Sequence, residues 1–178
     1  MNREELRYRN GFIFSMNYTG NLPVPSGWKL KAIHGGYLKY HPETNVSIRN
    51  MGNGAILLIG ECFHPDELIF NIDEVVDRLS SASSNREDLL DLLDNLAGRF
   101  ALLVFSEGEW EVFHDAIGSR SVFYHKEERL VASHIGLISS ALDLKYADYF
   151  IPFLTSKNYQ EKDVKYLPGL WTPYENIR

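Results

Sequence analysis

One short run of residues constrains the fold more than any other part of the chain. Residues 99–105 read RFALLVF, and after the arginine both alternating sets of positions carry apolar side chains. A strand that is apolar on both faces lies in an interior sheet with a layer of structure on each side. The sequence therefore predicts a sheet that is covered on both faces.

This strand belongs to a longer stretch, residues 96–142, which predicts four strands and a helix. After the strand over 99–105, further strand signals cover residues 110–114, 122–125 and 130–133. Tight turns separate them, and residues 135–142 then show helical spacing of apolar side chains.

The rest of the chain adds strands before this stretch and two helices between them. Strand signals cover residues 11–18, 28–33, 37–40, 46–49 and 55–60, the one at 28–33 alternating as a half-buried strand does. A helix is expected over 72–80, and a second one begins at Ser84 or Asn85 and ends at Gly98. Residues 61–65 are expected as a loop, and residues 146–154 as a helix that Pro152 interrupts. This order predicts an α+β fold, a four-layer αββα sandwich of two antiparallel sheets between helical layers.

Composition excludes several functional classes. The net charge of −6 and the absence of any Lys/Arg run argue against binding to nucleic acid or to anionic membranes. A single cysteine, Cys62, cannot form an intrachain disulfide and suits a reducing compartment. The first ten residues lack the apolar core of a signal peptide, and no apolar run is long enough to span a membrane. A cytoplasmic location is therefore expected.

Several motifs, in order, resemble the class II glutamine amidotransferase domain of asparagine synthetases and asparagine-synthase-like proteins. They are Ile59-Gly60-Glu61 followed by Phe63-His64, Gly98-Arg99-Phe100-Ala101, Asp115-Ala116-Ile117-Gly118 with Tyr124, and Ala132-Ser133-His134-Ile135. The resemblance covers roughly residues 10–170 and is most specific over 96–142. It implies an N-terminal-nucleophile (Ntn) hydrolase fold, with an amidotransferase-like domain over residues 1–160 and a linker over 161–178. The linker would lead into a C-terminal synthetase domain.

The positions that carry the chemistry of this family differ here. The family uses an N-terminal cysteine, whose thiolate attacks glutamine while its free amine acts as base. The resemblance places Asn10 at that position, preceded by nine residues, and Ile59 at the position of the oxyanion-hole asparagine. The family's glutamine-binding arginine has no counterpart, Arg49 included, and His134 replaces a glutamate. No catalytic residue is therefore expected.

Vestigial substrate contacts are expected at Gly60, Glu61, Asp115 and Gly118. For Gly60 and Glu61, a tight turn after a buried strand is an equally good interpretation. Asp115 and Gly118, together with Arg120, are interpreted more readily as residues that organise a turn. Cys62 with His64 as base is an alternative nucleophile. A metal site made of Cys62, His64, His114 and His125 is not expected, because helical His pairs and CxxC motifs are absent.

The sequence thus predicts a catalytically degenerate amidotransferase-like domain that acts as a scaffold or docking domain for ATP-dependent amide formation. The expected partner is an asparagine-synthase-like domain or subunit, and a homodimer is possible. The chain has no SGGxD-type loop, so ATP and Mg are implied only for that partner, and no cofactor is expected here. Two alternatives stay open: an active glutamine amidohydrolase with an atypical nucleophile, and a domain that senses a small molecule such as an amino acid.

Overall fold

The chain forms two antiparallel sheets and a few short helices. The structure is a computed structural model that describes residues 8–16, 22–156, 172–174 and 176–178. The five-stranded sheet has the order β2-β3-β1-β9-β8, and the four-stranded sheet has the order β4-β5-β6-β7. In chain order the strands are β1 (Phe12–Ser15), β2 (Lys29–Ile33), β3 (Gly36–Tyr40), β4 (Val46–Met51), β5 (Gly54–Phe63), β6 (Ala97–Ser106), β7 (Glu109–His114), β8 (Phe123–His125) and β9 (Leu130–Ala132). The prediction of an α+β chain with two antiparallel sheets is confirmed.

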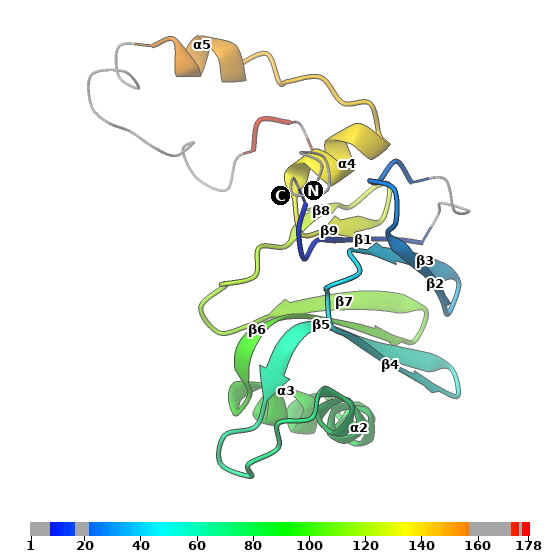
Figure 1. The fold of residues 1–178 in the computed structure, drawn as a ribbon. Helices are drawn as coiled ribbons and strands as arrows, with labels where there is room; N and C mark the ends of the chain where they lie inside the picture. Colours follow the sequence, from blue (N-terminus) through cyan, green and yellow to red (C-terminus); the bar gives the residue numbers. More distant parts are fainter. Residues whose placement is uncertain (1–7, 17–21, 157–171, 175) are drawn as a thin grey trace.

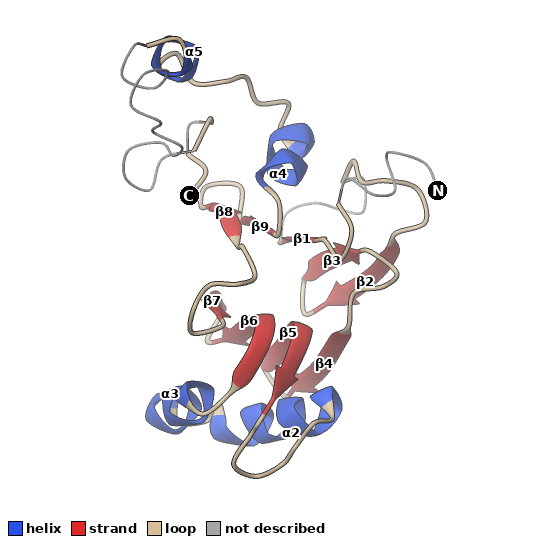
Figure 2. Cartoon of the chain, turned by 60° about the vertical axis from the view of Figure 1, so that its left-hand side comes forward, coloured by secondary structure: helices blue, strands red, loops and turns tan. Residues whose placement is uncertain are grey.

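Three apolar clusters show how sheets and helices pack. One cluster joins α2 (Ile72–Ala82) and α3 (Arg86–Asp94) to one face of β5 and β6. A second lies between the two sheets and contains Phe12, Phe14, Leu57 and Leu103. The third joins the far face of β1 and β9 to α4 (Ile135–Ala141). Helices therefore cover the outer faces of both sheets (Figures 1 and 2).

Strands β5 and β6 form the centre of the four-stranded sheet, as their sequence requires. The side chains of residues 55–59 and 100–105 are buried, since one set faces the helices and the other faces the second sheet. Burial on both faces is what the two-sided apolar patterns predict. β5 continues to Phe63, so the prediction of a loop at 61–65 is wrong for its first three residues.

Two glycines allow β5 and β6 to approach closely near one end. Gly60 and Gly98 have φ of +116° and +137°. A Cβ atom on Gly60 would lie 2.3 Å from the carbonyl oxygen of Arg99, and one on Gly98 would lie 2.2 Å from that of Glu61. The prediction that Gly98 ends a helix is wrong, because α3 ends at Asp94 and Gly98 pairs with Cys62 inside the sheet. Positive φ suits a glycine at either kind of position.

The helix starts follow their capping residues. The side chain of Asn71 accepts a hydrogen bond from the Asp73 N–H at the start of α2, and that of Asn85 accepts one from the Glu87 N–H at the start of α3. The last described helix, α5 (Phe150–Leu154), has Pro152 in its first turn, where a missing N–H costs no intrahelical bond. The prediction that Pro152 interrupts a helix is therefore wrong, because α5 contains Pro152 without a break.

Strand β2 differs from its prediction in burial. It pairs only with β3 at the edge of the five-stranded sheet, and Leu30 is 51% exposed. Only Ile33 of this strand is buried, because no described element covers the rest. Alternation along a sequence predicts a strand, but a covering layer decides its burial. Among the described residues, every helix is too short or too polar to span a bilayer.

Candidate functional site

A cavity of about 830 Å³ opens where the ends of the two sheets meet. The segments that line it are far apart in the sequence: residues 8–10 before β1, the β3–β4 loop, β5, β6, the β7–β8 connection, β8, the start of α4, and parts of 146–150 and 173–174. The lining side chains and backbone are those of Tyr8, Arg9, Asn10, Glu43, Thr44, Asn45, Gly60, Glu61, Arg99, Arg120, Ser121, Phe123, Ser133, His134, Ile135, Gly136, Tyr146, Phe150, Pro173 and Tyr174. The structure thus brings together Asn10, Gly60 and Glu61, three of the positions singled out by sequence.

Asn10 lies two residues before β1 and has a left-handed backbone conformation, with φ 56°. Its carbonyl oxygen accepts a hydrogen bond of 2.6 Å from Nη2 of Arg120, which lies in the β7–β8 connection. The carboxamide of asparagine has no nucleophilic atom comparable to a thiolate. The position contributes to the cavity wall without supplying a nucleophile.

Glu61 and Arg99 face each other across β5 and β6 next to Gly60. Oε1 of Glu61 accepts a hydrogen bond of 2.7 Å from Nδ2 of Asn45. Nε of Arg99 donates a hydrogen bond of 3.0 Å to the carbonyl oxygen of Ser119. Ile59, one residue before Gly60, has its side chain in the core between the sheets and does not line the cavity.

Asp115 and Gly118 do not line the cavity; they shape the turn that delivers Arg120 to it. The buried carboxylate of Asp115 accepts hydrogen bonds from the N–H and Oγ of Ser119 and from the N–H of Arg120, over 2.8–3.0 Å. Burial raises the pKa of Asp115, but these hydrogen bonds outweigh it and hold the pKa below its ordinary value. Gly118 has φ 63° in the same turn. Their contacts match the interpretation as turn residues.

Arg120 is the most unusual residue of the cavity. It is 8% exposed, and its guanidinium lies 5.5 Å from the centroid of the Phe12 ring. Its Nε is buried without a hydrogen-bond partner among the described residues. Burial, and then the charge of the nearby Arg99, lower the pKa of Arg120 to about 10, although Glu61 and Asp115 act in the opposite direction. A buried guanidinium of this kind is costly unless something anionic binds it.

Ser133 and His134 form a hydrogen-bonded pair at the wall beside β1. Oγ of Ser133 lies 2.8 Å from Nδ1 of His134. The same hydroxyl oxygen accepts a 2.8 Å hydrogen bond from the backbone N–H of Phe12. Burial, and then the charge of Arg120, lower the pKa of His134, which favours a neutral imidazole. Through the hydrogen bond with Phe12, the hydroxyl of Ser133 links the end of β9 to β1.

Cys62 lies on the other side of the four-stranded sheet. Its side chain packs in the cluster under α2 and α3 and does not line the cavity. Burial raises the pKa of its thiol to about 12. Both properties are unsuited to a nucleophile, which needs an accessible thiolate.

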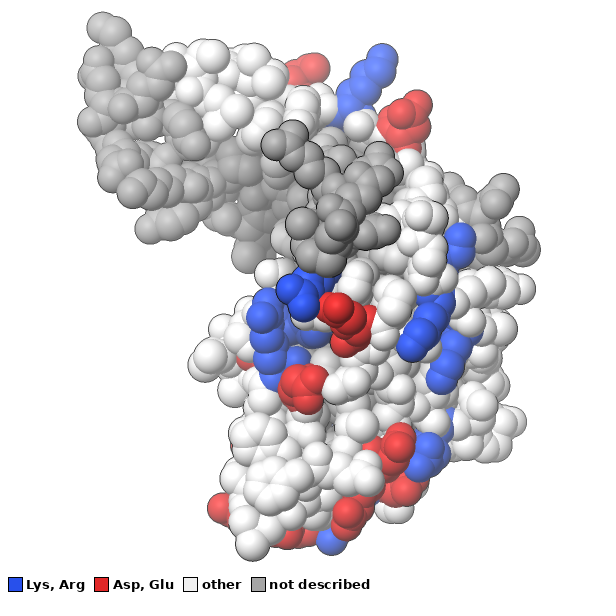
Figure 3. Space-filling model, viewed as in Figure 1, with Lys and Arg blue, Asp and Glu red and all other residues white. Residues whose placement is uncertain are grey.

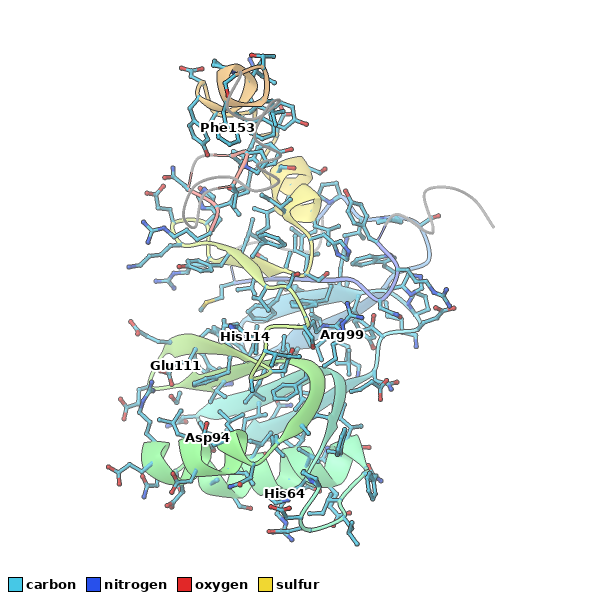
Figure 4. All side chains as sticks on the ribbon, turned by 90° about the vertical axis from the view of Figure 1, so that its left-hand side faces the viewer. His64, Asp94, Arg99, Glu111, His114 and Phe153 are labelled. Atoms are coloured by element: carbon cyan, nitrogen blue, oxygen red, sulfur yellow. The ribbon has the colours of Figure 1, made fainter. Side chains whose placement is uncertain are left out.

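The histidines are separated too. Figure 4 shows His64 at the end of the molecule near α2, whereas Arg99 lies at the level between the two sheets. Nδ1 of His64 accepts a hydrogen bond from the N–H of Glu67 in its own loop. Within the described ranges, no three His, Cys, Asp or Glu side chains are grouped in a way that could hold a metal ion.

Sequence reasoning did not single out Arg99, Ser133 or His134 as binding residues, and it assigned Arg120 to a turn. Two arginines, at positions 99 and 120, were the available signal, but their meeting depends on how β6 and the β7–β8 connection pack. Figure 3 shows basic and acidic side chains beside one another at the height where the sheets meet.

No family model matches this sequence, and no curated protein is significantly similar to it.

Proposed function

We propose that this chain is a catalytically degenerate class II glutamine-amidotransferase-like domain of an asparagine-synthase-like protein. Its role is that of a scaffold or docking domain for ATP-dependent amide formation. In this proposal ATP and Mg bind to a partner domain and not to this chain. Because proteins of one fold carry many different activities, the function assigned to this chain depends on the residues of its site.

The layering supports an αββα sandwich of the Ntn-hydrolase type. Apolar clusters lie between α2, α3 and the four-stranded sheet, between the two sheets, and between the five-stranded sheet and α4. Packed layers of this kind are expected where two sheets each bury both faces.

One observation carries the proposal. Asn10 and the Gly60–Glu61 pair are fifty residues apart in sequence, yet they line the same cavity. The family resemblance assigns the nucleophile and a substrate contact to these positions, and in an active enzyme the two must lie together. The shared cavity supports common ancestry of the site.

The side chains at the reactive positions support a loss of activity. Asn10 has no nucleophilic side chain, and its backbone nitrogen is part of a peptide bond and not a free amine. The side chain of Ile59 has no hydrogen-bond donor. Arg49 forms an ion pair with Asp77 of α2 and does not line the cavity, so it does not replace the missing glutamine-binding arginine.

Incubation of the purified chain with glutamine tests the proposal that the chain is catalytically inactive. We expect no ammonia above the rate of spontaneous hydrolysis, and no adduct with a glutamine-analogue diazoketone in intact-mass spectra. Ammonia release, or an adduct mapped to any residue, would contradict degeneracy. An adduct on Cys62 would favour the atypical amidohydrolase.

Complex formation tests the docking part. The chain is mixed with a purified asparagine-synthase-like synthetase domain. We expect the two proteins to co-elute in size-exclusion chromatography and to show the summed mass by light scattering. Separate elution at micromolar concentrations of both would reject the docking role.

A further inference from the structure

We propose that the cavity binds the oxyanion group of a small molecule, a carboxylate or a phosphate, through the guanidinium of Arg120 with the help of Arg99. The inference goes beyond the scaffold role, because a chain that docks and a chain that does not could both bind such an anion. It assigns a binding site to side chains that the amidotransferase resemblance leaves without a role.

Arg120 is buried without an anionic partner. No carboxylate oxygen of a described residue lies within 4.0 Å of its nitrogens. The one hydrogen bond that its guanidinium forms within the described part of the chain is to the carbonyl oxygen of Asn10, and the Nε–H has no partner there. Burial of an unpaired charge is strongly unfavourable, so proteins bury guanidinium groups with a carboxylate or a bound anion.

Arg99 increases the positive charge at the same place. It lines the cavity, and it lies close enough to Arg120 to lower the pKa of that residue. Its hydrogen bond is to a neutral carbonyl, and it forms no ion pair with a described carboxylate. Two guanidinium groups that repel each other beside one cavity are stabilised when an anion binds between them.

The carboxylates of the cavity do not meet this need. Glu43 forms an ion pair with Arg9 over 2.7 Å. Glu61 accepts a hydrogen bond from Asn45, and the structure describes no ion pair for it. The described lining has three arginines and two glutamates, a net charge of +1, whereas the whole chain has a formal charge of −6. The cavity is therefore locally positive in an acidic protein.

Guanidinium geometry and cavity size define the ligand class. The planar fork of an arginine matches the paired oxygens of carboxylates and phosphates. The cavity volume of about 830 Å³ is in the range of small-molecule sites and exceeds what a simple ion fills. Tyr146, Phe150 and Tyr174 also line it, and the ring centroid of Tyr146 lies 5.0 Å from that of Phe150 and 5.3 Å from that of Tyr174. We infer a small organic molecule with an anionic end and an apolar body.

Calorimetric titration of the full chain tests this inference. The probes are inorganic phosphate and succinate, with succinamide as the uncharged analogue of succinate, all at matched ionic strength. We expect at least one anion to bind and to raise the melting temperature, and succinamide to do neither. Comparison of the two anions distinguishes a phosphate from a carboxylate site.

Three variants locate the site. Arg120→Met and Arg99→Gln should each weaken binding by about tenfold or more, since each removes charged hydrogen bonds to the anion. Arg86→Gln is the control, because Arg86 is an exposed arginine paired with Glu111 away from the cavity. The affinity of this variant for the anion should equal that of the unaltered chain. If Arg120→Met does not fold, Arg99→Gln decides alone. The inference is overturned if neither anion binds, or if the arginine variants bind as the unaltered chain does.

Discussion

Nη2 of Arg120 donates a hydrogen bond to the carbonyl oxygen of Asn10 over 2.6 Å, which joins residues 110 positions apart. Arg120 follows the last strand of the four-stranded sheet, and Asn10 precedes β1 of the other sheet. The bond therefore links the two sheets at the cavity. It does not follow that the arginine stabilises the fold, since its charge is buried.

Replacement of Arg120 by methionine tests whether this arginine stabilises the fold. Burial of the guanidinium without an anionic partner is unfavourable, so an apolar side chain of similar length should leave the free energy of unfolding within about 1 kcal/mol or raise it. Urea denaturation measures this change. Leu58→Ala, in the core, is a reference that should lose about 2–5 kcal/mol. A loss above about 3 kcal/mol in Arg120→Met would show instead that this arginine has a structural role.

Asp115 should stabilise the turn before Arg120 in a pH-dependent way. Asp115→Asn replaces a carboxylate that accepts three hydrogen bonds, and should cost about 1–3 kcal/mol at pH 7. The pKa of Asp115 is lowered in the folded state, so its contribution is complete above the pKa of the unfolded chain and is lost as pH falls through the folded pKa. Urea titrations at pH 7 and pH 3 should therefore show a smaller difference between the variant and the unaltered chain at pH 3.

Asp94→Asn is the matched control for this experiment. Asp94 is an exposed residue at the end of α3 with no described hydrogen bond from its side chain (Figure 4). Its replacement should change stability by less than about 0.5 kcal/mol. Equal losses in the two variants would mean that the turn hydrogen bonds contribute nothing specific.

Gly60 and Gly98 should not tolerate a side chain. Both have φ values that favour glycine, and a Cβ atom at either would overlap a backbone oxygen of the neighbouring strand. Each alanine variant should lose about 3 kcal/mol or more, from backbone strain together with steric overlap. Gly52→Ala is the control, because its Cβ would meet no atom within 4 Å. Thermal melts that place Gly60→Ala level with Gly52→Ala would refute the close approach of β5 and β6.

Cys62 should be nearly inert in the folded protein. A thiol pKa of about 12 leaves roughly a thousandfold less thiolate at neutral pH than an ordinary cysteine has. Alkylation by iodoacetamide, followed by mass spectrometry of the Cys62 peptide, should therefore be slow in buffer and fast in urea. The raised pKa also means that stability should be lost as pH rises from about 9 toward 12. Rapid alkylation of the folded chain would reopen a catalytic role for this thiol.

Much of the secondary structure was predictable because it depends on local periodicity. The two-sided apolar runs at residues 55–60 and 99–105 predict interior strands, and the apolar spacing over 72–80 predicts the helix that α2 forms. The boundaries were less predictable. Gly98 was predicted to end a helix, because glycine is common at that position, but its pairing with Cys62 places it in β6. Of the predicted linker, residues 172–174 and 176–178 are described, and Arg178 exchanges backbone hydrogen bonds with Tyr124.

The candidate site divides in the same way. The sequence by itself determined that Asn10 and Ile59 supply no nucleophile and no oxyanion donor, because these are properties of single side chains. Only the tertiary structure decided that Asn10, Gly60 and Arg120 share a cavity and that Arg120 is buried there without a carboxylate. Strand pairing and sheet stacking bring distant segments together, and no periodicity in the sequence encodes which segments meet. The environment of a charge, and therefore its capacity to bind an anion, is set by those distant contacts.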